Sequence, residues 1–182
     1  MIILASNSES RAKILNDFGV EFSQKGCDFD EDALVAESPK NFVYQATLGK
    51  YNECKKELGL EIPLLVADTV VTAHNQILRK AKDVEDARRI LELQSGSVAS
   101  IITCMIYESK DFYFLDISTT DYHFDVFPKE ALDAYLASGE WRGKAGACMV
   151  EGFCKPYICE VRGLESNAMG LGIEKLLPFI DV

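Results

Sequence analysis

Short apolar runs and longer amphipathic segments alternate along the first half of the chain. The opening run, residues 1–5, predicts a strand that is followed at once by a polar turn. Beyond the turn, Ile14, Leu15 and Phe18 recur at helical spacing, and Gly19 is typical of a residue that ends a helix. This order predicts a strand–turn–helix unit at the start of the fold.

Capping residues and an unbroken run delimit the next elements. A helix over residues 39–58 is predicted from Ser38 as its N-cap and Pro39 at its first position. Residues 64–71 lack alternation, which is typical of a strand buried on both faces of a parallel or mixed sheet. A further helix is expected over residues 83–93.

The second half of the chain is richer in β-structure. Residues 98–107 and 112–127, joined by a turn at residues 108–111, predict a long hairpin. The elements expected after it are a helix over residues 129–138, a strand over residues 156–162 and a last helix over residues 166–177.

The order of elements predicts an α/β fold class. We expect a mixed β-sheet with flanking helices and two lobes around a cleft, within a single domain that spans residues 1–182. Length and composition agree with this, because 182 residues of which 48% are apolar suffice for one domain with a real core.

The charge argues against two classes of partners, nucleic acids and anionic membranes. The chain carries 19 Lys and Arg against 29 Asp and Glu, a net charge of −10. A nucleic-acid binder needs a dense basic footprint, and an anionic membrane surface repels an acidic protein. No apolar run approaches the roughly 20 residues of a spanning helix, and the start lacks the basic region of a secretion signal. We therefore expect a cytoplasmic protein with no nucleic-acid or membrane partner.

The cysteines point to neither zinc nor secretion. No two of them form a C-x-x-C pair, so a structural zinc site is not expected. Without a secretion signal we expect reduced thiols, most of them small buried side chains. The six residues are Cys27, Cys54, Cys104, Cys148, Cys154 and Cys159.

The first polar turn offers chemistry that suits phosphate. Residues 6–11 open a helix, where backbone N–H groups carry partial positive charge. The hydroxyls of Ser6, Ser8 and Ser10 and the guanidinium of Arg11 add hydrogen-bond donors. Plain N-capping by Ser8 explains the turn equally well, so both interpretations stay open.

Asp68 and Lys50 each break an apolar pattern. Asp68 is predicted at the end of the buried run, where α/β folds place ligand sites. A buried carboxylate there requires a metal, a basic partner or strong hydrogen bonds. Lys50 shares a helical stripe with Val43, Ala46 and Cys54, so it either snorkels to solvent or reaches a site and holds an anion.

Further charged residues have two interpretations each. An acidic run before the second helix is either a solvated loop or a set of hard oxygen ligands for Mg²⁺. Lys80 and Lys82 follow a tight turn predicted at Asn75 and Gln76, and by default they are surface lysines. The members of the acidic run are Asp28, Asp30, Glu31 and Asp32.

A series of motifs in order carries a family resemblance. They are LASNSESR (residues 4–11), Lys50, VADTVV (66–71), RKAKDVEDA (79–87), SGSVASIITC (95–104), TDYHF (120–124), GEWRGKAGACMVEG (139–152) and SNAMGLGI (166–173). On these residues, nearly the whole chain resembles the Maf (septum-formation) family of nucleoside triphosphate pyrophosphatases.

The resemblance implies a cytoplasmic hydrolase that depends on a divalent metal, Mg²⁺ or Mn²⁺. It is expected to split a nucleoside triphosphate between the α and β phosphates, with a fold similar to that of inosine-triphosphate pyrophosphatases. Removal of modified or noncanonical nucleotides and a link to cell-division arrest are also implied, with a homodimer allowed. The alternative is a non-catalytic nucleotide-binding regulator of division.

The same resemblance implies roles for individual residues. Asp68 is similar to the family's general base or metal-holding carboxylate, and Glu31 matches the acidic residue that helps bind the metal. The substrate-binding positions are Ser6, Ser8, Arg11, Lys50, Lys80 and Lys144.

Three positions, Ser10, Thr69 and Glu151, track substrate choice in the family. Thr69 is similar to the branch acting on dTTP and UTP, Glu151 to the branch acting on 7-methyl-GTP, and Ser10 to neither. A carboxylate only accepts hydrogen bonds, so Glu151 suits the N–H groups of guanine or cytosine and repels the carbonyls of uracil and thymine. We therefore expect a preference for guanine-type or cytosine nucleotides.

Overall fold

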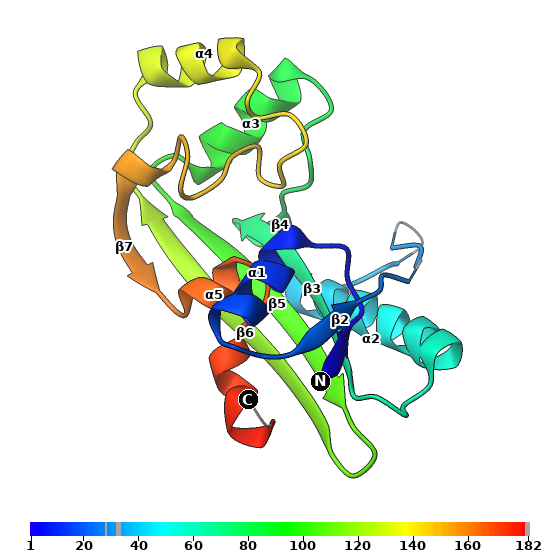
Figure 1. The fold of residues 1–182 in the computed structure, drawn as a ribbon. Coiled ribbons are helices and arrows are strands. Elements are labelled where there is room, and N and C mark those ends of the chain that lie inside the picture. Colours follow the sequence, from blue (N-terminus) through cyan, green and yellow to red (C-terminus); the bar gives the residue numbers. More distant parts are fainter. Residues whose placement is uncertain (28, 32–33, 181–182) are drawn as a thin grey trace. The chain divides into compact units, whose positions relative to one another are not determined.

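The computed structural model describes residues 1–27, 29–31 and 34–180, shown in Figure 1. Asp28 and Asp32 of the acidic run lie outside the described residues. The chain forms two compact units, in agreement with the two predicted lobes. Unit 1 comprises Met1–Thr69, Ile102–Thr119 and Leu164–Val182, and unit 2 comprises Val70–Ile101 and Thr120–Gly163.

The β-strands form a mixed sheet, as predicted. In the described part of the chain, seven strands are arranged in the order β2-β1-β3-β5-β6-β7, and β4 pairs with β3. β1 is parallel to β2 and β3, whereas the β3–β4 and β6–β7 pairs are antiparallel. The bounds are β1 Ile2–Leu4, β2 Phe22–Gln24, β3 Leu64–Ala73, β4 Gln76–Ile77, β5 Val98–Glu108, β6 Tyr113–Phe124 and β7 Ile158–Arg162.

Three of the described helices begin at capping residues that their sequences favour. Ser8, Ser38 and Asp83 each accept a hydrogen bond from a backbone N–H three residues further on. Gly139 ends its helix in the left-handed conformation. None of the described helices has the length and apolar character needed to cross a membrane. The bounds are α1 Glu9–Asp17, α2 Pro39–Leu58, α3 Val84–Gln94, α4 Lys129–Ser138 and α5 Glu165–Ala168, with 3₁₀ turns at Lys155–Tyr157, Ile173–Lys175 and Leu177–Phe179.

The core of unit 1 confirms that β3 is buried on both faces. Leu65 and Ala67 belong to one cluster of buried residues, together with residues of α1 and the C-terminal segment. Leu64 and Val66, which alternate with them, belong to a second cluster that includes Cys54 of α2. Because successive side chains of a strand point to opposite faces, helices must cover both sides of β3.

Asp68 lies in the middle of β3 and not at its end, so the predicted end of this strand is wrong. The strand continues to Ala73 because it gains β4 as an antiparallel partner after β1 has ended. The last pair between β1 and β3 is Leu4 with Leu65. Asp68 therefore lies three residues beyond the carboxyl end of β1, level with the loop that leads into α1.

Two short strands were not predicted, and two local predictions are wrong. β2 and β4 are too short to give a hydrophobic pattern, so sequence analysis missed them. The tight turn is at His74 and Asn75, both with positive φ (50° and 60°), which suits a two-residue hairpin loop. The predicted C-terminal helix is broken, because Gly170 has a φ of 107° and the chain continues only as short 3₁₀ turns.

The cysteines differ from the prediction of six reduced thiols. Cys27 is bonded to Cys54 and Cys148 to Cys154, with Cα–Cα distances of 5.5 and 6.7 Å that disulfides permit. Pairing between residues far apart in sequence depends on which elements pack together, and spacing alone does not reveal it. The remaining thiols are Cys104, which is buried as expected, and Cys159, which is exposed.

Candidate functional site

Arg11, in the first half of α1, is held by three acceptors of the protein. Its Nε donates to the carbonyl oxygen of Gly170 (2.9 Å), Nη1 to Ser6 Oγ (3.0 Å) and Nη2 to Thr69 Oγ1 (3.1 Å). A guanidinium carries five N–H donors in a fixed plane, so these bonds use three of the five. The structure thus brings Ser6 and Arg11 of the first polar turn together with Thr69, which the sequence predicted separately.

A line of hydroxyl groups continues from Arg11 to Thr103 on β5. Thr69 Oγ1 lies 2.9 Å from Thr103 Oγ1, which lies 2.8 Å from the carbonyl oxygen of Asn167. A carbonyl only accepts, so Thr103 donates its one proton there and Thr69 donates to Thr103. Since Thr69 also accepts from Arg11, its hydroxyl has one lone pair left and can serve a further partner only as an acceptor.

Lys50 of α2 meets two carboxylates. Its Nζ forms an ion pair with Glu31 and lies 3.2 Å from Asp68 Oδ2. The other oxygen of Asp68, Oδ1, accepts the Thr69 N–H at 2.9 Å, and Asp68 is only 7% exposed. Asp68 thus has the basic partner and the hydrogen bond that its burial requires, and Lys50 reaches a site instead of extending to solvent.

The formal charges of the four groups described above, Arg11, Lys50, Asp68 and Glu31, cancel. Burial lowers the pKa of the Arg11 guanidinium, while the carboxylates of Asp68 and Glu31 act on it in the opposite direction. Two cations, Arg11 and Lys50, thus face two carboxylates. A triphosphate added to this cluster needs further positive charge, because its oxygens and the carboxylates repel one another.

Glu31 and Asp68 fit a hard divalent cation. Their oxygens converge on one position, that of Lys50 Nζ, and Asp68 Oδ2 is buried without a well-aligned hydrogen bond. Mg²⁺ is commonly held by one or two carboxylates, with waters and substrate phosphates as its other ligands. Among the residues that the structure describes, no three His, Cys, Asp or Glu side chains are grouped to hold a metal. The donor set therefore suits Mg²⁺ carried together with a phosphate ligand.

In unit 2 the structure brings Lys80 beside the turn that carries Lys144. The backbone of Lys80 pairs with that of Ala145. The buried side chain of Gln94 donates to the carbonyl oxygen of Gly146 at 2.7 Å and fixes this turn. Gly146 has a φ of 69°, which favours glycine at this position. Two lysines far apart in sequence are thereby neighbours on a fixed backbone.

The other predicted positions have simpler surroundings. Ser8 Oγ accepts the Arg11 N–H at 3.3 Å, which confirms the capping interpretation. Ser10 and Glu151 are exposed in their respective units, as is Lys82.

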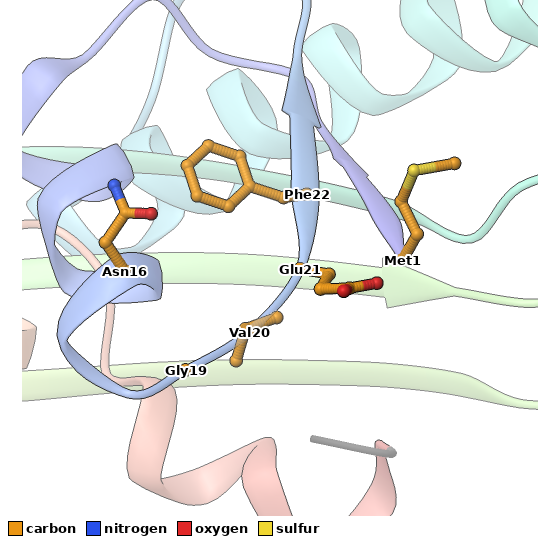
Figure 2. A pocket seen from close by; sticks show the side chains of 6 residues that line it. All are labelled: Met1, Asn16, Gly19, Val20, Glu21 and Phe22. Atoms are coloured by element: carbon orange, nitrogen blue, oxygen red, sulfur yellow. The ribbon is translucent and has the colours of Figure 1, made fainter.

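Two open surface pockets of unit 1 are lined by other residues. One lies between the end of α1 and β2, and Figure 2 shows its lining side chains. The other runs along α2 beside Phe29. None of the candidate site residues lines either pocket. The residues of the first are Met1, Asn16, Gly19, Val20, Glu21 and Phe22.

The hydrogen bonds described above join six residues that we call the Arg11 cluster: Ser6, Arg11, Thr69, Thr103, Asn167 and Gly170. Sequence analysis missed the last three. Arg11 and Gly170 are 159 residues apart, and Thr69 and Thr103 are 34 apart, so no spacing rule joins them. A signal existed for Thr103, because it is a polar residue inside an apolar strand and is only 2% exposed. All three residues also lie within motifs that carry the family resemblance, but no role was predicted for them.

Comparisons with known proteins give a consistent result. The family model described as Maf-like protein matches residues 1–181. A relative from Nitratiruptor sp., named nucleoside triphosphate pyrophosphatase, is 56% identical over 178 residues, or 97% of this chain and 96% of the relative. A protein of the same name from Helicobacter pylori strain J99 is 37% identical, covering 97% of this chain and 93% of its own. The Campylobacter jejuni protein of that name is 35% identical over 183 residues, which is 99% of this chain and 100% of the relative.

Proposed function

Because the chain belongs to the Maf-like protein family, we propose that it is a nucleoside triphosphate pyrophosphatase. It hydrolyses a nucleoside triphosphate between the α and β phosphates and releases a monophosphate and pyrophosphate. One observation carries this proposal: Glu31, Asp68 and Lys50 meet next to the Arg11 cluster. The same small region thus offers hard oxygen ligands and fixed cations.

Hydrolysis of a phosphoanhydride needs charge neutralisation on the phosphoryl oxygens and a positioned water. We assign the first task to Arg11 and Lys50 of unit 1. The family resemblance gives Lys80 and Lys144, which are neighbours within unit 2, a phosphate-binding role as well. Arg11 has two N–H donors beyond its three protein bonds, so it can bind phosphate oxygens without leaving its acceptors. Lys50 exchanges a carboxylate partner for a phosphate oxygen when substrate binds.

Glu31 and Asp68 hold Mg²⁺ or Mn²⁺ in this proposal. The bound metal neutralises phosphate charge and lowers the pKa of a coordinated water. Asp68 Oδ1 is fixed by the Thr69 N–H, so Oδ2 is the oxygen left to join the metal ligands or to take the proton of the attacking water. The Thr69 N–H therefore fixes Oδ1 of Asp68, and Oδ2 is left to bind the metal or to accept a proton.

The base preference rests on Glu151, while Thr69 matches the family's branch acting on dTTP and UTP. Glu151 is exposed in unit 2 and, as a carboxylate, only accepts hydrogen bonds. Acceptors suit the amino groups of guanine and cytosine, so we propose guanine-type or cytosine nucleotides as the preferred substrates.

The test is product analysis with a panel of normal and modified nucleoside triphosphates, with Mg²⁺, with Mn²⁺ and with excess chelator. We expect pyrophosphate and monophosphate in equal amounts, and no turnover in chelator. Release of orthophosphate instead would contradict cleavage between the α and β phosphates. Asp68→Asn is the control for a contaminating hydrolase, because it keeps the shape of the side chain.

The alternative of a non-catalytic nucleotide-binding regulator is less favoured by the site. Two carboxylates repel a bare triphosphate, so a pure binding site has no use for both. Tight nucleotide binding without turnover of any nucleotide in the panel would support the regulator.

The cytoplasmic location, the removal of noncanonical nucleotides, the link to division arrest and the homodimer remain proposals. Light scattering after gel filtration tests the homodimer. A deletion strain scored for division timing tests the link to arrest.

A further inference from the structure

Three residues at alternate positions before α2 each contact that helix. We call Cys27, Phe29 and Glu31 the strap residues. Cys27 forms a disulfide with α2, the ring of Phe29 packs on it, and Glu31 makes an ion pair with it. Their partners on α2 are, in the same order, Cys54, Gly49 and Lys50.

The contact between Phe29 and Gly49 explains a glycine in the middle of a long helix. Glycine is a poor residue for a helix interior, where alanine is the most favourable. A Cβ at Gly49 would overlap three ring atoms of Phe29, Cζ, Cε2 and Cε1. The ring of Phe29 therefore occupies the space that a side chain at position 49 would need. The contact depends on the presence of both Gly49 and Phe29.

The disulfide anchors the first strap residue in the core of unit 1. Cys54 is only 1% exposed and belongs to a buried cluster with Tyr51 and Ile106. Cys27 packs against the same cluster. On α2, Cys54 and Lys50 are four residues apart and share one face, so the anchor lies one helical turn from the partner of Glu31.

We propose that Cys27 and Phe29, the first two strap residues, are positioning residues for Glu31. The disulfide and the contact between Phe29 and Gly49 hold the Glu31 carboxylate on Lys50, which also meets Asp68. Reduction of the disulfide releases the strap and makes the position of Glu31 sensitive to thiols. Only the metal-binding consequence of this proposal rests on the proposed function.

The redox step is an ordinary thiol–disulfide exchange. A dithiol such as dithiothreitol gives two electrons and two protons to the bond between Cys27 and Cys54 and becomes a cyclic disulfide. The products in the protein are two thiols. The reverse step needs a disulfide oxidant, for which oxidised glutathione serves in the experiment.

The first measurement is hydrogen exchange by mass spectrometry on the peptide that carries the strap residues, without metal or nucleotide. A disulfide typically contributes a factor of about 30 to 700 to the equilibrium between closed and open chain. We therefore expect exchange at the strap to rise at least about tenfold in dithiothreitol and in Cys54→Ser. Cys148→Ser, which removes the other disulfide, is the matched control and should leave the strap protected.

The second measurement is compensation between Gly49 and Phe29. Gly49→Ala alone should raise exchange at the strap, because the new Cβ displaces the ring. Adding Phe29→Leu shortens the side chain and should restore protection. If Gly49→Ala acts only through the stability of α2 and not through the Phe29 ring, adding Phe29→Leu will not restore protection.

The last readout is the Mg²⁺ concentration that gives half of full activity. Loss of a supporting contact to a metal site commonly costs about 10–100-fold in affinity, so we expect this concentration to rise about tenfold on reduction. Unchanged exchange after reduction and in Cys54→Ser overturns the proposal, as does equal loosening in Cys148→Ser. Because exchange needs no turnover, a protein that hydrolyses no nucleotide would refute the proposed function and leave this test decisive.

Discussion

The guanidinium shape of Arg11, and not its charge alone, should stabilise unit 1. Arg11→Lys keeps the positive charge. It replaces the planar guanidinium and its five N–H donors by a single ammonium group at the end of a shorter side chain. The three acceptors of Arg11 belong to Ser6, Thr69 and the backbone of Gly170. They surround the guanidinium from different elements, so a single ammonium nitrogen can keep about one of the three bonds.

The magnitude follows from the two lost bonds. Hydrogen bonds from a charged donor contribute roughly 1.5–3 kcal/mol each. Arg11 is only partly buried, so hydrogen bonds to water recover some of the lost free energy. We therefore expect Arg11→Lys to lower the free energy of unfolding by about 2–4 kcal/mol, a large part of the ~5–15 kcal/mol of a typical domain. For a chain of this size, each kcal/mol shifts Tm by about 2–4 °C, so Tm should fall by roughly 4–16 °C.

The assay is urea denaturation followed by circular dichroism, supported by thermal melting. Lys13→Arg is the matched control, because it makes the reverse exchange two residues away on α1. Lys13 is an exposed residue paired with Asp17, and such pairs contribute little, so this variant should melt like the wild type. If Arg11→Lys and Lys13→Arg unfold at the same urea concentration, the hydrogen-bond geometry of Arg11 does not stabilise the unit and the reasoning fails.

Four further predictions concern the site and the thiols. Asp68→Asn should lower kcat about 10²–10⁴-fold with the fold intact, measured by pyrophosphate release, and near-normal turnover would remove Asp68 from catalysis. Lys50→Ala should lower kcat/KM about 10–150-fold through a lost charged hydrogen bond, and wild-type kinetics would refute its phosphate role. Glu151→Gln should shift the ratio of GTP to UTP turnover toward UTP by about 5–150-fold, and an unchanged ratio would contradict base reading by Glu151. Burial raises the pKa of Cys104 to about 11, so a thiol reagent at pH 8 should label only Cys159 in the native, unreduced protein and both after unfolding. Labelling of Cys104 in the native protein would contradict its burial, and labelling of any of the other four cysteines would show that a disulfide is absent. The unfolded Cys104 thiol ionises first, near its usual pKa of 9.0, so stability should fall as pH rises from about 9 to about 11.

Local chemistry determined much of the fold from the sequence alone. Ser38 and Asp83 start helices because their side chains accept an N–H of the first turn, and each does so in the structure. The run without alternation around Val66 predicted a strand buried on both faces, as found. These features depend on residues close together in the sequence, which is why a sequence pattern contains them.

The individual site residues were also accessible to sequence analysis, but their partners were not. The need of a buried Asp68 for a basic partner follows from the cost of an unpaired charge. That this partner is Lys50, and that Glu31 joins it, depends on how α2 and the preceding segment pack against β3. A sequence pattern carries no information on such a contact, because it brings together residues that are far apart in the chain.

Only the tertiary structure decided the Arg11 cluster and the strap residues. Gly170 accepts a hydrogen bond from Arg11 through its backbone carbonyl. Because every residue type has this group, the sequence cannot indicate which carbonyl Arg11 contacts. The disulfide between Cys27 and Cys54 depends on a Cα–Cα distance of 5.5 Å that the fold creates. The sequence therefore determined which groups are present and which elements carry them. The packing of those elements determined which groups meet, because long-range contacts are paid for by burial of the whole core and not by any local signal.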